Sequence, residues 1–298
     1  MRAPAKVNLD LFIDGRRDDG FHELRTTMLM VGLYDEIRMG TCREPGVHFT
    51  QEGPALSRDV PTDSSNLAVG AVEQGLQALQ NEGHEVPGIK LALIKHIPIG
   101  AGLGGGSSDG AAALAGLQEL LDLQLDGGPA QRILAGLGSD CAFFHGARET
   151  GLGLCFGRGE RVQALPGPQG WWLVLLTPDL QVSTPAVFGA LQASALGQAP
   201  PAPVALAWST FSADQARAKQ HNDLEPAALR AVPALQEWRA ALDARFHLSG
   251  SGSSFYCLCE GESLAHELLQ ELARELHDNQ LQPRLLTALP LALDCTDR

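Results

Sequence analysis

The stretch that decides the fold of this chain is Pro98-Ile99-Gly100-Ala101-Gly102-Leu103-Gly104-Gly105-Gly106-Ser107-Ser108-Asp109. It follows an alternating strand pattern at 88–96 and precedes an Ala/Leu-rich helix pattern that reaches about Leu123. Glycines let the backbone approach a ligand closely, consecutive N–H groups form an anion nest, and the N-terminus of the following helix adds partial positive charge. The stretch therefore predicts a phosphate cradle between a strand and a helix.

Other interpretations of this loop fit less well. Gly100-x-Gly102-x-x-Gly105 matches the dinucleotide-binding fingerprint, but no second apolar strand that ends in an acidic residue follows the helix. The lysine that a P-loop requires after its glycines is absent. A purely structural turn does not account for five glycines and two serines within residues 100–108.

The charge of the chain limits its partners. The 298 residues carry a formal charge of −13, and only four of the 22 cations are lysines: Lys6, Lys90, Lys95 and Lys219. An acidic chain without a Lys/Arg block is not expected to bind nucleic acid or an anionic membrane through a broad basic surface. The sequence shows neither a membrane-spanning apolar run nor a signal-peptide pattern, so we expect a cytoplasmic protein.

The six cysteines are scattered and form no C-x-x-C pair. The nine histidines form no H-x-x-x-H or H-x-H cluster. These patterns favour reduced cysteines in the core over a metal cage built by the protein. They leave the ligands of any bound metal, and the oligomeric state of the chain, unassigned.

The periodicity of the chain predicts an α+β fold, because strands and helices alternate without a strict β-α-β period. A helix is predicted at about 224–243, and residues 192–210 resemble an exposed excursion inside the second domain. Strands are predicted at 5–13, 24–32, 35–40, 46–50, 88–96, 151–157, 160–165, 171–177, 253–259 and 282–289, and further helices at 67–80, 107–123, from Pro129 to about 136, and 262–277.

A change of texture near residue 150 predicts two domains. Residues 1–150 contain the glycine-rich loop, and residues 151–298 begin with three closely spaced strands. The last strand is a candidate to return to the first domain.

Three motifs in order resemble the GHMP kinase family, which includes galactokinase and the homoserine, mevalonate and phosphomevalonate kinases. They are Pro4-Ala5-Lys6-Val7-Asn8-Leu9, the loop from Pro98 to Asp109, and Leu248-Ser249-Gly250-Ser251-Gly252-Ser253-Ser254. The resemblance covers nearly the whole chain. It implies a two-domain GHMP kinase fold with its active site in the cleft between domains, ATP as co-substrate and Mg²⁺ as cofactor.

Three further strings resemble one branch of this family, whose substrate is an alcohol linked to cytidine diphosphate. They are Arg17-Asp18-Asp19-Gly20-Phe21-His22-Glu23-Leu24, Leu137-Gly138-Ser139-Asp140-Cys141-Ala142-Phe143-Phe144, and Asn222-Asp223-Leu224-Glu225-Pro226. Two alternatives remain open: another GHMP small-molecule kinase of the homoserine or mevalonate type, and a catalytically silent nucleotide-binding regulator.

The resemblance implies two catalytic residues. Asp140, expected at a helix-to-strand junction, would accept the proton of the substrate hydroxyl and contact the substrate, although an aspartate near glycine often only shapes a turn. Lys6 would lie beside it and stabilise charge on the transferred phosphoryl group. Retention of both residues argues against a silent regulator.

On the nucleotide side, the resemblance assigns the phosphates to Pro98, Ile99, Gly100, Ala101, Gly102, Leu103, Gly104, Gly105, Gly106, Ser107 and Ser108. Lys95 and Asn66 would face the adenosine, with a strand-edge cation and a helix N-cap as their alternative roles. Ser107 and Ser108 suit phosphate or Mg²⁺. Asp109 is expected to cap its own helix.

On the acceptor side, Phe21 and Phe188 would stack on the two faces of the cytosine, and His22 would read its polar edge. Asn8 and Thr184 would contact the same substrate. Either phenylalanine taken alone would more commonly be a core residue.

Overall fold

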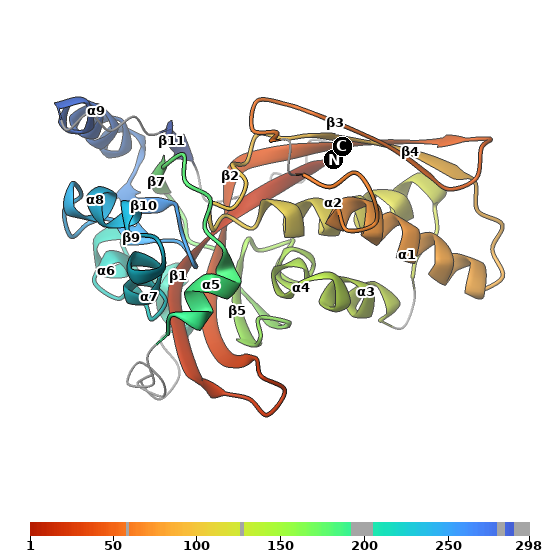
Figure 1. The fold of residues 1–298 in the computed structure, drawn as a ribbon, viewed down its shortest axis with the longest axis horizontal. Coiled ribbons are helices and arrows are strands. Elements are labelled where there is room, and N and C mark those ends of the chain that lie inside the picture. The colour runs from red at the N-terminus through yellow and green to blue at the C-terminus, as the bar shows by residue number, and fades with distance from the viewer. Residues whose placement is uncertain (58–59, 126–127, 192–204, 279–283, 289–298) are drawn as a thin grey trace. The chain divides into compact units, whose positions relative to one another are not determined.

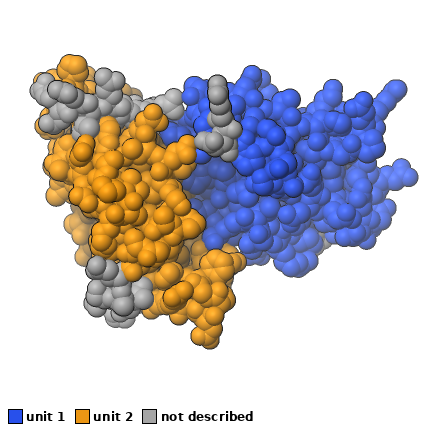
Figure 2. Space-filling view, viewed as in Figure 1, with its two compact units in different colours: residues 1–5, 33–99, 104–148 blue, residues 6–32, 100–103, 149–298 orange. Residues whose placement is uncertain are grey.

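The computed structural model describes residues 1–57, 60–125, 128–191, 205–278 and 284–288 (Figure 1). The chain divides into two compact units, which Figure 2 colours separately. The first unit comprises residues 1–5, 33–99 and 104–148, and the second comprises residues 6–32, 100–103 and 149–298. The second unit therefore includes residues 6–32 and residues 100–103 of the glycine-rich loop, whereas the sequence predicted a single boundary near residue 150.

Two long strands connect the units through the chain itself. Strand β1 (Arg2–Arg16) changes unit after Ala5, and β2 (His22–Cys42) changes unit after Gly32. The sequence predicted two strands at 24–32 and 35–40, but the chain continues without a turn between them.

The first unit packs helices on a sheet. Strand β4 (Gly88–Ile94) pairs antiparallel with residues 36–42 of β2 and parallel with β3 (Val47–Glu52). Helices α1 (Leu67–Asn81) and α2 (Gly105–Leu121) contribute Val72 and Leu117 to a core that also contains Ile37 and Leu91 from the sheet. Helices α3 (Pro129–Leu137) and α4 (Ser139–Gly146) complete the unit.

The second unit holds two groups of paired strands. Strand β5 (Leu152–Gly157) pairs with β2 and with β6 (Arg161–Leu165), while the short β8 (His221–Asn222) pairs parallel with β1. A separate four-stranded sheet has the order β11-β7-β10-β9. Its strands are β11 (Arg284–Ala288), β7 (Trp171–Thr177), β10 (Phe255–Glu260) and β9 (His247–Leu248).

The second unit also contains helices. They are α5 (Thr184–Gly189), the 3-10 helix η2 (Ala205–Thr210), α6 (Ala213–Arg217), α7 (Glu225–Ala231), α8 (Ala234–Ala240) and α9 (Glu262–Asp278). Their apolar residues, among them Leu235 and Leu272, share a core with Val174 and Phe255. Strand β11 pairs with β7 inside this unit, so the last strand does not return to the first unit.

The predicted α+β class is confirmed, but several boundaries were wrong. Helix α2 begins at Gly105, because Gly104 adopts a left-handed conformation (φ +69°) that starts the helix before the serines. The predicted helix at 224–243 is broken into α7 and α8 at Pro233, since proline disfavours helical backbone at the residue before it. Of the predicted excursion at 192–210, residues 192–204 lie outside the described residues and 205–210 form η2.

Four of the described cysteines are buried and form no disulfide: Cys141, Cys155, Cys257 and Cys259. This confirms the predicted core role for them, whereas Cys42 is only half-buried and Cys295 lies outside the described residues. Within the described part of the chain, no helix combines the length and apolar character needed to cross a membrane.

Two leucines of α2 test the packing of the first unit. Leu117 is 0% exposed and Leu120 is 37% exposed. We expect Leu117→Ala to lower the free energy of unfolding by about 2–5 kcal/mol, because it leaves a cavity in the core. The matched variant Leu120→Ala should change it by no more than about 0.5 kcal/mol. Chemical denaturation followed by circular dichroism measures both, and equal effects would contradict the packing described.

Candidate functional site

The polar face of β1 lies in the second unit. Lys6 is 4% exposed, and its Nζ donates a hydrogen bond of 2.6 Å to Asn8 Oδ1. Asn8 Nδ2 in turn donates to Thr26 Oγ1 at 2.8 Å. Further along, Asp10 accepts bonds from the backbone N–H and the hydroxyl of Thr27, while burial raises the pKa of Asp10. The alternation predicted from sequence therefore produces a buried row of polar side chains.

The third glycine loop, residues 248–254, packs directly on this row. Gly250 has φ +56°, and a Cβ built on it would lie 3.2 Å from Asn8 Oδ1 and 3.3 Å from Lys6 Nζ. The absence of a side chain thus lets loop backbone reach the lysine. The sequence identified this loop as a motif but assigned no site residue to it, although its Gly-Ser-Gly pattern is a signal for close backbone approach.

The start of the second motif meets both other motifs in this unit. Ser249 Oγ donates to Gly102 O at 2.9 Å, and Lys6 N donates to Leu103 O at 2.9 Å. Gly102 has φ +75°, and a Cβ there would lie 2.2 Å from Ser249 O. The structure therefore brings together Lys6, Asn8, residues 100–103 and the third glycine loop.

The rest of the second motif opens α2 in the first unit. Ser108 is 1% exposed, and its hydroxyl has no hydrogen-bond partner among the described residues. Ser107 hydrogen-bonds the thiol of Cys141. An unpartnered hydroxyl at the first turn of a 17-residue helix, where N–H groups are also free, suits an anionic oxygen or a hard cation.

A buried cluster of three charged side chains, Lys95, Asp35 and Asp109, lies beside the glycine-rich loop. Lys95 is 3% exposed, and its ammonium donates to Asp35 and, at 2.8 Å, to Asp109 Oδ2. Asp35 Oδ1 also accepts the backbone N–H groups of His96 and Ile97 at 2.5 and 2.8 Å. The cluster thus ties the residues before the glycine loop to the helix that follows it.

The charged groups of this cluster shift each other's pKa values. Burial raises the pKa of Asp109 to about 7 against the opposing charge of Lys95. Burial also lowers the pKa of Lys95, but the charges and hydrogen bonds of Asp109 and Asp35 outweigh it, so the pKa is raised overall. The expectation that Asp109 caps α2 was wrong, because the N-cap of this helix is Gly104. Asp35 was missed, because it lies 60 residues from Lys95 and no local motif marks it.

Asp140 and Asn66 are also in the first unit. Asp140 stands in the first turn of α4, directly after α3, so the predicted strand after it was wrong. Gly138, two residues earlier, packs near Ser107, with 3.6 Å from an added Cβ to the serine Oγ. Asn66 is the N-cap of α1: its Oδ1 accepts Ala68 N, and its Nδ2 donates to Pro61 O. This confirms its capping role.

The acceptor-side aromatics lie in the second unit. The rings of His22 and Phe188 stack with centroids 5.1 Å apart and planes 27° apart. Phe21 is 52% exposed and lies under the guanidinium of Arg158, 4.7 Å from the ring centroid. The structure thus pairs His22, not Phe21, with Phe188. Thr184 begins α5, and its hydroxyl is 2.9 Å from Ser251 Oγ of the third glycine loop.

The surroundings of His22 favour its neutral imidazole form. Burial, with a smaller contribution from the charge of Arg16, lowers the pKa of His22. A neutral imidazole offers one donor and one acceptor nitrogen.

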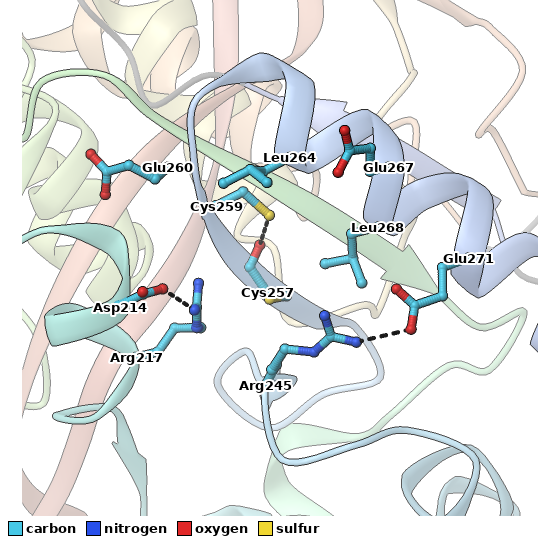
Figure 3. Close-up of a pocket in the computed structure, with 10 residues that line it drawn as sticks. All are labelled: Asp214, Arg217, Arg245, Cys257, Cys259, Glu260, Leu264, Glu267, Leu268 and Glu271. Atoms are coloured by element: carbon cyan, nitrogen blue, oxygen red, sulfur yellow. Dashed lines mark hydrogen bonds and ion pairs between the residues drawn. The ribbon is translucent and has the colours of Figure 1, made fainter.

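A polar pocket elsewhere in the second unit contains none of the predicted site residues (Figure 3). Arg217 bonds to Asp214 and to Leu258 O, and Arg245 pairs with Glu271. Both arginines of the pocket are therefore paired, while carboxylates outnumber arginines in its lining. Its lining is Asp214, Arg217, Arg245, Cys257, Cys259, Glu260, Leu264, Glu267, Leu268 and Glu271.

Comparisons with known proteins bear on the family. Residues 66–146 match the model of the GHMP kinases N terminal domain. A 4-diphosphocytidyl-2-C-methyl-D-erythritol kinase of Citrifermentans bemidjiense is 36% identical over 277 residues, which is 91% of this chain and 93% of the relative. One of Streptomyces avermitilis is 36% identical over 281 residues, 91% of each chain.

Solved structures agree in fold. A crystal structure of 4-(cytidine 5'-diphospho)-2C-methyl-D-erythritol kinase matches with a TM-score of 0.74 and 32% identity, covering 97% of this chain and 98% of that one. A homoserine kinase from Cytophaga hutchinsonii matches with a TM-score of 0.68 and 18% identity, covering 97% and 93%, and shares the fold. Near-complete coverage at over 30% identity, together with the three motifs, shows that this chain belongs to the GHMP kinase family.

Proposed function

We propose that this chain is an ATP-dependent kinase that phosphorylates the 2-hydroxyl of 4-diphosphocytidyl-2-C-methyl-D-erythritol, a step of the non-mevalonate isoprenoid pathway. The observation that carries the proposal is the convergence of two glycine-rich loops on Lys6: Gly250 packs against its buried ammonium, and Leu103 O accepts its backbone N–H. The choice of substrate is supported by relatives of that name, which align over 91% of the chain, and by the aromatic residues of the second unit.

The phosphates of ATP would lie on residues 98–108. The backbone N–H groups and the N-terminus of α2 supply partial positive charge, so the cradle needs no lysine of its own. The buried, unpartnered hydroxyl of Ser108 fits a phosphate oxygen or Mg²⁺. Bound Mg²⁺ would supply neutralisation of the phosphate charge. Lys95 already bonds two carboxylates, so its expected contact with the adenosine has to come from the remaining donor or the alkyl chain.

The transfer step needs alignment and charge neutralisation more than covalent chemistry. The substrate hydroxyl oxygen forms a bond to the γ-phosphorus, the bond from this phosphorus to the β,γ-bridging oxygen breaks, and ADP leaves. Asp140 accepts the proton of the hydroxyl. Lys6, kept in place by Asn8, stabilises negative charge on the transferred group.

The acceptor would be held through its cytosine. Phe188 and Phe21 present ring faces for stacking, and neutral His22 supplies a donor and an acceptor for the edge of the base. His22 stacks on Phe188 in this structure, so a base that stacks on the same face of Phe188 would displace the imidazole. Asn8 and Thr184 would contact the rest of the acceptor.

A substrate panel tests the proposed reaction. With ATP and Mg²⁺, we expect ADP release in a coupled assay with 4-diphosphocytidyl-2-C-methyl-D-erythritol, and release at the background rate with homoserine or mevalonate. Only the first acceptor carries a cytidine diphosphate group. Turnover of homoserine or mevalonate would assign the chain to another GHMP activity, and ATP binding without turnover of any acceptor would favour a silent regulator.

Removing the proposed base tests the chemical step. Asp140→Asn keeps the size of the side chain but does not accept a proton, so kcat should fall by about 10²–10⁴-fold while KM changes little. Asp122→Asn makes the same chemical change at the exposed end of α2 and should leave kcat unaltered. Wild-type phosphoryl transfer by Asp140→Asn would exclude the proposed mechanism.

Loss of either aromatic ring tests the cytosine site. Phe21→Ala and Phe188→Ala should each raise KM for the cytidine diphosphate substrate by about tenfold, because stacking on a base contributes roughly 1–3 kcal/mol. The KM for ATP in the same variants is the internal control and should stay the same. An unaltered KM for the acceptor in both variants would show that the cytosine binds elsewhere.

A further inference from the structure

The string Asn222-Asp223-Leu224-Glu225-Pro226 has no role in the site so far. The side chain of Asn222, however, uses all of its hydrogen-bonding groups in a specific way. Its Nδ2 donates to Leu248 O at 2.9 Å and to Gly250 O at 2.8 Å, and its Oδ1 accepts Leu224 N at 2.9 Å. Two carbonyls require the amino end of the amide, and the N–H group requires its oxygen, so the orientation of the side chain is determined.

The two carbonyls belong to the third glycine loop and its entry strand. Gly250 is the residue whose backbone lies against Lys6 Nζ and Asn8 Oδ1. The neighbouring residue of the loop, Ser249, donates a hydrogen bond from its Oγ to Gly102 O and so links the loop to the second motif. The amide of Asn222 therefore holds the residue whose backbone packs against Lys6 Nζ and Asn8 Oδ1.

The string from Asn222 to Pro226 is also bonded to β1, the strand that carries Lys6. Leu11 of β1 pairs with Asn222, and Asp223 N donates to Leu11 O at 3.0 Å. Asp223 Oδ2 accepts Ile13 N at 2.8 Å. The string is thus anchored to β1 downstream of Lys6, and it reaches across to the loop that covers Lys6.

Glu225 supports the same loop from its entry side. Its carboxylate accepts a hydrogen bond from the backbone of Leu248 and lies 3.7 Å from the guanidinium of Arg239. Arg239 also donates to Phe246 O at 2.7 Å. Donors and acceptors of the string therefore fix both the N–H and the C=O of Leu248, and the C=O of Gly250.

We propose that Asn222 is a positioning residue, which sets the third glycine loop over Lys6 and Asn8 for phosphoryl transfer. This inference rests on the proposed function. Asn222 acts through the Gly250 carbonyl and touches neither substrate. Because Gly250 packs against the lysine without a side chain between them, a displacement of the loop changes the surroundings of the ammonium directly. Misplacement of reacting groups by about 1 Å is enough to cost about 100-fold in rate.

The isosteric variant Asn222→Asp tests this inference. It keeps the acceptor for Leu224 N but places a carboxylate oxygen against the carbonyls of Leu248 and Gly250, which repels the loop. We expect kcat to fall by about 10- to 100-fold with KM for the cytidine diphosphate acceptor within about threefold of wild type. Asn222→Ala, which removes the donor without adding repulsion, should lose less activity.

A matched control separates this effect from added charge. Asn81→Asp makes the same change at the exposed end of α1, where Asn81 accepts a hydrogen bond from Gln77, and should keep the wild-type kcat. If Asn222→Asp does not fold, Asn222→Ser takes its place. The serine retains one donor, and its kcat should lie between those of wild type and Asn222→Ala.

Several outcomes would overturn the inference: wild-type kcat in Asn222→Asp, a loss confined to KM, an equal loss in Asn81→Asp, or a larger loss in Asn222→Ala than in the isosteric variant. The last would assign Asn222 a packing role. The proposed function is judged separately, by whether the wild-type protein turns over the cytidine diphosphate acceptor at all, whereas this inference is judged by the ratio of variant to wild type.

Discussion

Two glycine-rich loops of the second unit meet backbone to backbone, and the arrangement around Lys6 depends on this contact. A Cβ on Gly102 would lie 2.2 Å from Ser249 O and 2.9 Å from Gly252 O. No other residue type fits such an approach, and the positive φ angles of Gly102 and Gly250 strain any side chain that replaces the hydrogen. The glycines are therefore needed for packing between the loops as well as for approach to a phosphate.

Burial of two lysines fixes positive charge at defined places in an acidic chain. Two of the four lysines, Lys6 and Lys95, are buried beside oxygen atoms of the protein, so their charges are fixed in place and not spread over the surface. In the Lys95 cluster two carboxylates share one ammonium, and removal of one partner of such a buried pair costs roughly 3–5 kcal/mol. Lys95 thereby contributes to the structure of the phosphate loop, beyond any contact with a nucleotide.

Local patterns in the sequence predicted most of the fold and part of the site. The strand alternation around Lys6, the N-cap Asn66 and the loop at 98–109 are each recorded within a few consecutive residues. Asp35 and the pairing of His22 with Phe188 depend on contacts across 60 and 166 residues, and a single sequence carries no local signal for them. The junction after Asp140 was mistaken for the start of a strand, because the aromatic and small residues that follow suit either structure.

Long strands shared by both units have a consequence for how the chain can be divided. Residues 6–32 belong by their contacts to the same unit as residues 149–298, although more than 100 residues of sequence separate the two segments. A fragment that starts at residue 149 lacks the β1 partner of β8 and the β2 partner of β5. Cleavage near residue 150 would leave pieces that each lack part of a sheet, so the second unit needs residues from both sides of that point to complete its strand pairing.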